Sequence, residues 1–139
     1  MFTLTVRDHI MIAHSLPDPF FGPAQRLHGA TYEVEATWAR PVLDEHSVVM
    51  DIGLASQLLS GVLDGLRHRN LDEHPDFAGR LSTTEVLARY VAEHLAAGAA
   101  GIEGLERLTV SLRETPDAWA SYTLELPVLS ERGGPAPVR

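Results

Sequence analysis

The stretch TYEVEATW, Thr31–Trp38, alternates apolar and polar residues and therefore predicts a half-buried strand of an antiparallel sheet. Three further segments have the same period of two. They are FTLTV at residues 2–6, LTVSLR at residues 108–113 and ASYTLEL at residues 120–126. We therefore expect four strands, two near the beginning of the sequence and two near its end.

Between the two pairs of strands the apolar residues recur at three and four positions, which is typical of amphipathic helices. The first helix has Asp51 as its predicted N-cap. Its apolar face is formed by Ala55, Leu58, Leu59, Val62, Leu63 and Leu66. The second helix begins at STTE, Ser82–Glu85, which has the spacing of a capping box, and it ends near Gly98.

The resulting order, β-β-α-α-β-β, predicts an α+β fold with both helices on one face of a four-stranded antiparallel sheet. The helices cover only one face of that sheet. Because the uncovered face and the free edges of a sheet favour association, we expect a homo-oligomer in which the sheets of several subunits pack together.

The composition narrows the class of protein. The sequence has 139 residues, 45% of them hydrophobic and 22% charged, as expected for one soluble domain. We predict this single domain over residues 1–127. A flexible tail over residues 128–139 follows, because the segment from Pro127 onward contains three prolines and two glycines.

The charge and the missing cysteines exclude several functions. A net charge of -8 disfavours binding to the phosphate backbone of nucleic acids. The absence of cysteine removes thiolate nucleophiles and cysteine-ligated metal sites. No stretch approaches the roughly 18 apolar residues that span a membrane, so we expect a cytoplasmic protein without a membrane partner.

Two of the seven histidines form the best candidate for a metal site. His14 ends the predicted first strand and His28 begins the second, so a hairpin joined by residues 15–27 places both imidazoles at one end of the sheet. Neutral imidazole is a common zinc ligand. The spacing therefore predicts a shared metal ion, and the alternative is that each histidine only forms hydrogen bonds in its loop.

Glu114 follows Leu112 at the spacing of the apolar face, where an unpaired carboxylate would be costly. One interpretation is that it accepts paired N–H bonds from the guanidine-like edge of a ring. The alternative is that the strand has ended and Glu114 belongs to an exposed turn before Pro116.

Two further groups of polar residues have open interpretations. Thr83 and Thr84, at the start of the second helix, suit an anion or a polar heterocycle, although capping alone would explain them. Arg67, His68 and Arg69 form a short basic cluster, which suits either recognition of a triphosphate or an ordinary solvated loop.

Six pieces of sequence support a family resemblance through their order and spacing. They are Ala13-His14, Leu27-His28-Gly29, Val49-Met50-Asp51, His68-Arg69-Asn70-Leu71-Asp72, Thr83-Thr84-Glu85 and Glu114-Thr115. The chain resembles the 6-pyruvoyl tetrahydropterin synthase and 6-carboxytetrahydropterin synthase family, which acts on dihydroneopterin triphosphate. The resemblance covers nearly the whole sequence. It implies the tunnelling fold, or T-fold, in which subunits join their sheets into a barrel, commonly as a dimer of trimers and hence a hexamer.

The resemblance also implies a metal site. In the family, zinc is bound by one histidine at the position of His14 and by a His-x-His pair that begins at the position of His28. Here the last residue of that pair is Ala30. The family's cysteine base, four residues before the pair, is replaced by Ala24.

The remaining matches concern catalysis and ligand binding. His68 matches the family's catalytic histidine, but the aspartate before it is replaced by Arg67. Glu114 matches the glutamate that anchors the pterin ring, and Thr83 and Thr84 match the two threonines beside it. The resemblance therefore predicts a preserved binding site next to a degenerate catalytic site.

Three hypotheses follow. The first is a pterin lyase or synthase in which zinc, held by His14, His28 and a water or Gln25, acts with His68. The second is a metal-poor module that binds a pterin or a purine, or an enzyme of altered reaction. The third is a structural ring-forming protein, and the presence of Glu114 with both threonines argues against it.

Overall fold

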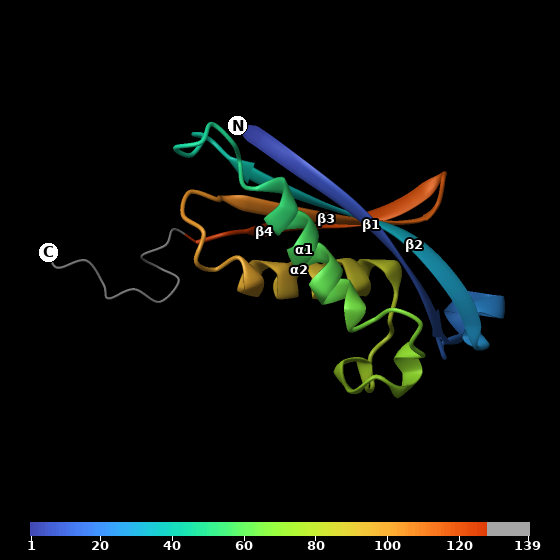
Figure 1. Cartoon of the computed structure of the whole chain (residues 1–139). Helices are drawn as coiled ribbons and strands as arrows, with labels where there is room; N and C mark the ends of the chain where they lie inside the picture. The colour runs from blue at the N-terminus through green and yellow to red at the C-terminus, as the bar shows by residue number, and fades with distance from the viewer. Residues whose placement is uncertain (128–139) are drawn as a thin grey trace, which may run out of the picture.

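The computed structural model describes residues 1–127, and the predicted tail at 128–139 lies outside the described residues. The element order is the predicted one. The strands and helices are β1 (Phe2–His14), β2 (His28–Arg40), α1 (Ile52–Asp64), α2 (Thr84–Gly98), β3 (Arg107–Thr115) and β4 (Ala118–Glu125). Short 3-10 helices lie in the connections: η1 (Pro19–Gln25), η2 (Leu71–Glu73) and η3 (Pro75–Phe77). Both α-helices lie on one face of the sheet (Figure 1).

The sheet has the strand order β1-β2-β3-β4, and each neighbouring pair is antiparallel. The β1–β2 ladder runs from Phe2 opposite Arg40 to His14 opposite His28. β3 pairs with only part of β2, from Glu33 to Ala39. The β1–β2 hairpin therefore extends beyond β3 at the end that carries the two histidines.

The core lies between the sheet and the two helices, and it confirms the predicted alternation. The sheet contributes the fully buried Tyr32, Val34, Ala36, Trp38, Leu108, Val110 and Leu112. The helices contribute Ala55, Leu59, Leu63, Leu87, Val91 and Leu95. Burial of each large aliphatic side chain contributes about 1.5–3 kcal/mol, so this layer supplies most of the driving force for folding.

The helix caps show one success and one error of the sequence analysis. Asp51 caps α1 as predicted, because its carboxylate accepts the Leu54 N–H at 2.8 Å. In α2 the cap is Thr83, whose hydroxyl accepts the Val86 N–H at 3.2 Å, and not Ser82, with which the capping box begins. Ser82 is instead buried against His14.

The face of the sheet away from the helices is polar. Small hydroxyl residues pair across it, such as Thr5 with Thr37 and Ser111 with Ser121, each at 2.7 Å between oxygens. No helix within residues 1–127 is long and apolar enough to cross a membrane.

Candidate functional site

The two histidines of the predicted metal site lie together at the end of the β1–β2 hairpin. His14 and His28 are direct partners in the ladder, and their ring centroids are 4.7 Å apart at an interplanar angle of 64°. The His14 side chain is buried, whereas His28 is partly exposed. The hairpin geometry predicted from the sequence is therefore correct.

Backbone carbonyls fix the proton on each ring. The Nδ1 atom of His28 lies 2.8 Å from the carbonyl oxygen of Arg26, and Nδ1 of His14 lies 3.0 Å from both oxygens of Ser82. A carbonyl only accepts, so each Nδ1 carries the proton and each Nε2 keeps a lone pair. Burial, and then the proximity of His28, lower the pKa of His14, which favours the neutral ring that a metal requires.

The two imidazoles do not complete a zinc site. No group of three or more histidine, cysteine, aspartate or glutamate side chains within residues 1–127 is arranged to hold a metal ion. Zinc in proteins has three or four protein ligands, so this pair supplies too few.

Glu114 lies at a break in the β3–β4 ladder. Arg113 is opposite Trp119 and Thr115 is opposite Ala118, so Glu114 is the extra residue of a β-bulge. The strand continues to Thr115, so it does not end before Glu114. The carboxylate is nevertheless exposed, so the expected cost of a buried charge does not arise.

The bulge brings Glu114 to the start of α2. The Thr84 hydroxyl donates to Glu114 Oε2 at 3.5 Å, which is a long hydrogen bond. Ser82 contacts His14, Thr83 caps α2 and Thr84 contacts Glu114. Three consecutive residues thus connect the histidine pair with the glutamate.

Tyr32 is a buried residue close to the polar groups of this site, and the sequence analysis assigned it only to the core. Burial raises the pKa of Tyr32 to about 12, and the nearby carboxylates Glu114 and Glu85 also raise it, although a hydrogen bond to Thr84 opposes the shift. The Tyr32 hydroxyl therefore stays protonated and uncharged near neutral pH.

Two hollows adjoin Glu114. The larger has a volume of about 450 Å³, within the range of small-molecule sites, and is lined by Thr31, Glu33, Arg113, Glu114, Thr115 and Pro116. The smaller has a volume of about 120 Å³ and is lined by Thr84, Glu85, Glu114, Ala118, Trp119 and Ala120. Glu114 is common to both, and it is exposed.

Comparisons with known proteins identify the family of this chain. The sequence model of the family described as 6-pyruvoyl tetrahydropterin synthase matches residues 3–125. The chain belongs to this family. It is also 32% identical over 126 residues to the 6-carboxy-5,6,7,8-tetrahydropterin synthase of Bacillus subtilis (strain 168), covering 87% of this chain and 84% of the relative.

Solved structures show the shared fold. The 6-pyruvoyl tetrahydropterin synthase of Caenorhabditis elegans superposes with a TM-score of 0.76 at 27% identity, covering 87% of this chain and 94% of that one. The Plasmodium falciparum enzyme of the same name has a TM-score of 0.73 at 15% identity, covering 89% and 98%. The four-stranded sheet with helices on one face is therefore the T-fold, as predicted.

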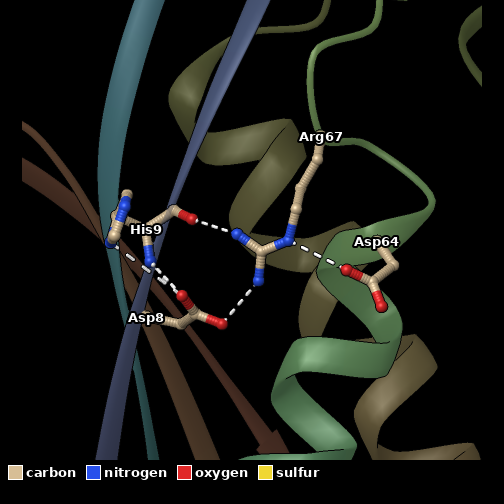
Figure 2. A network of polar contacts seen from close by, with 4 residues as sticks. All are labelled: Asp8, His9, Asp64 and Arg67. Carbon is tan, nitrogen blue, oxygen red and sulfur yellow. Dashed lines mark hydrogen bonds and ion pairs between the residues drawn. The ribbon is translucent and has the colours of Figure 1, made fainter.

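At the position of the 6-pyruvoyl tetrahydropterin synthase family's aspartate, Arg67 has a structural role. Its guanidinium donates to Asp8 at 2.6 Å, to Asp64 at 2.9 Å and to the carbonyl of His9 (Figure 2). Arg67 is thus committed to acidic partners within the chain. Arg67 is therefore not available to a triphosphate, which argues against the interpretation of Arg67, His68 and Arg69 as a triphosphate-binding cluster.

His68 remains apart from the other predicted site residues. It has a φ of 56°, and its N–H donates to the carbonyl of Met11 at 2.8 Å, which holds the loop against β1. Its side chain is exposed. Among the described contacts, none joins the His68 ring to His14, His28 or Glu114.

Sequence reasoning missed two features of the site. The pairing of Ser82 with His14 spans 68 positions and has no local signal. The second is the contact between Trp119 and Arg113, which are opposite each other in the β3–β4 ladder, with the guanidinium carbon 4.1 Å from the centre of the indole ring. The signal for this contact in the sequence was a single tryptophan among the small and polar residues of the β3–β4 hairpin.

Proposed function

We propose that this protein binds a pterin of the dihydroneopterin triphosphate type through Glu114, with Thr83 and Thr84 beside the ring. The observation that carries this proposal is the exposed carboxylate in the β3 bulge, next to the Thr84 hydroxyl and open to a hollow of about 450 Å³. Membership of the 6-pyruvoyl tetrahydropterin synthase family supports the choice of ligand.

The chemistry of recognition follows from the carboxylate. A pterin presents a 2-amino group and an adjacent ring N–H on one edge, and an ionised carboxylate accepts both in a bidentate contact. Such charge-assisted hydrogen bonds contribute about 1.5–3 kcal/mol each. Guanine presents the same edge, so a purine ligand remains the second candidate, which the binding experiment compares directly.

We further propose that the catalytic site is degenerate. Ala24 has no group that can accept a proton, and Arg67 is engaged with Asp8 and Asp64 instead of orienting His68. General acid–base catalysis typically contributes about 10² to 10⁴-fold. His68 is left as the candidate proton carrier, and we expect it to support only slow turnover of the family's substrate.

Binding calorimetry with Glu114→Gln tests the proposed function. The variant keeps the size of the side chain but replaces an acceptor with a donor, so pterin binding should weaken by about 1.5–3 kcal/mol. Folding should be unaffected because Glu114 is exposed. Titrations with pterin and with guanine identify the preferred ring.

Glu45→Gln is a suitable control because the Glu45 side chain is 85% exposed in a different loop. It should leave the affinity unchanged. Equal affinity in the unchanged protein and in Glu114→Gln, or no affinity in either, would contradict the proposal.

A further inference from the structure

His14 and Ser82 are two buried polar residues that are hydrogen-bonded to each other. Only 2% of the His14 surface and 3% of the Ser82 surface are exposed. Nδ1 of the imidazole lies 3.0 Å from the carbonyl oxygen of Ser82 and 3.0 Å from its hydroxyl oxygen. A buried polar group that loses its partner is destabilising, so this contact fixes where the two segments meet.

His14 is on the firmly held side of this contact, because the end of β1 is bonded along both of its edges. One edge pairs with β2 over the whole length of β1. On the other edge, the Ala13 N–H donates to the Arg69 carbonyl at 3.0 Å. Ser15 donates to the Asp72 carboxylate through its N–H at 3.0 Å and through its hydroxyl at 2.6 Å. The imidazole therefore reaches Ser82 from a fixed base.

Ser82 immediately precedes the N-cap of α2. The first carbonyl in the hydrogen-bond ladder of this helix is that of Thr83, which accepts the Leu87 N–H at 2.9 Å. The Ser82 carbonyl thus lies outside the ladder, and the imidazole N–H is its donor. Two residues further on, the Thr84 hydroxyl donates to Glu114. The bond from His14 therefore holds the end of α2 that contacts the carboxylate.

The contact between Thr84 and Glu114 depends closely on where α2 begins. At 3.5 Å it is at the upper limit of a hydrogen bond, so a small displacement of the helix breaks it. Glu114 lies on β3, which is a different element from the one that carries Thr84. The position of the hydroxyl relative to the carboxylate is therefore set by whatever holds the start of α2.

We propose that His14 is a positioning residue of the ligand site, whose Nδ1–H holds Ser82 and thereby keeps the Thr84 hydroxyl on the Glu114 carboxylate. This inference rests on the proposed function. It gives the buried histidine a role that needs no metal, and within residues 1–127 no third side chain joins the two imidazoles to hold one. The Nε2 atom, which would be the metal ligand, has no part in this role.

Two substitutions of His14 separate its two ring nitrogens. In His14→Asn the amide nitrogen is bonded to Cγ, as Nδ1 is in histidine, so the donor is kept and the Nε2 ligand atom is lost. His14→Ala removes both nitrogens. Pterin binding is measured by calorimetry in a buffer that contains EDTA, so that no metal contributes. The affinity should fall about fivefold or more in His14→Ala, and in His14→Asn it should stay within about twofold of the unchanged protein.

Thr84→Ala tests the route by which His14 acts. If the effect passes through the Thr84 hydroxyl, then adding His14→Ala to Thr84→Ala should lower the affinity by less than a further factor of about two. A loss of about fivefold in both backgrounds would overturn the inference, because His14 would then act independently of Thr84. His74→Ala is the matched control, since His74 is also a buried histidine but bonds to Asp76 within its own loop, and it should leave the affinity unchanged.

An unchanged affinity in His14→Ala, or equal losses in His14→Ala and His14→Asn, would also overturn the inference. If His14→Ala does not fold, His14→Asn decides alone: retained affinity supports the role of the donor, and a loss of about fivefold contradicts it. If Glu114→Gln weakens binding and His14→Ala does not, the proposed function stands without this inference. Absence of pterin binding to the unchanged protein contradicts both.

Discussion

His14 and His28 keep their ligand atoms free because their Nδ1 atoms face oxygen acceptors, a carbonyl of Ser82 or Arg26 in each case. This is the arrangement that orients histidines toward metals in proteins. The position that would extend the pair holds Ala30, which has no ligand atom. The residues thus favour metal binding individually but are too few to bind zinc tightly.

We predict weak zinc binding through His14 and His28, because two imidazoles leave a tetrahedral site half complete. Elemental analysis after dialysis should find well under one zinc ion per chain. His14→Ala combined with His28→Ala should remove the remainder, whereas His46→Ala, in an exposed loop, should not change it. One zinc ion per chain retained in the double variant would show that the assigned ligands are wrong.

The sequence predicts the positions of some site residues and not of others. The pairing of His14 with His28 was predictable, because a hairpin relates its two ends by simple geometry. The bulge at Glu114 was not predictable, because a bulge depends on how two strands pair and the sequence of one strand does not show it. The role of Ser82 depends on packing between distant segments.

At the scale of elements, the end of α1 is tied to β1 by charged groups (Figure 2). Arg67, just beyond α1, contacts Asp8 on β1 and Asp64 in the last turn of α1. Burial by itself raises the pKa of Asp8, but hydrogen bonds from the His9 N–H and from Arg67 outweigh it, so the pKa lies below its ordinary value of 3.8. The charged carboxylate therefore stabilises the folded state.

The pH dependence of this contribution follows from its sign. A carboxyl with a lowered pKa stabilises the fold above its unfolded value and loses this effect as the pH falls through the folded value. Asp8→Asn should therefore lower the free energy of unfolding by about 1–2 kcal/mol near pH 7, and by less near pH 3, which is below the ordinary pKa of 3.8. Urea unfolding at both pH values measures the difference.

Asp64→Asn provides the control for this prediction. Asp64 contacts the same guanidinium, but its side chain is 67% exposed, against 25% for Asp8. Exposed ion pairs contribute little, so we expect a change within about 0.5 kcal/mol. If the cost of Asp8→Asn is the same at both pH values, the carboxylate charge does not stabilise the link.

The elements themselves were well predicted, because hydrophobic periodicity is a local property of the sequence. The four strands, the two helices and the Asp51 cap are as expected. β1 also ends at His14, as predicted. Pairing with β2 over the whole length of β1 keeps this run of 13 residues continuous.

At the scale of the whole molecule, the two outer strands of the sheet, β1 and β4, each have only one neighbouring strand among the described residues. Free edges of this kind favour pairing with another chain, and joining them closes sheets into a barrel. These free edges, together with the dimer of trimers that the family resemblance implies, lead us to propose a homohexamer. Light scattering should report about six times the chain mass of 15.2 kDa, and a stable monomer at micromolar concentration would contradict this proposal.

The central claim is that this member of the 6-pyruvoyl tetrahydropterin synthase family keeps a pterin site and lacks the groups for efficient catalysis. The most direct test is the rate at which the zinc-supplemented protein converts dihydroneopterin triphosphate, with the Bacillus subtilis relative assayed alongside. We predict a rate lower by about 10²-fold or more, which is the typical contribution of a general base. Turnover comparable to that of the relative would contradict the claim and would require another base, with His68 the first candidate.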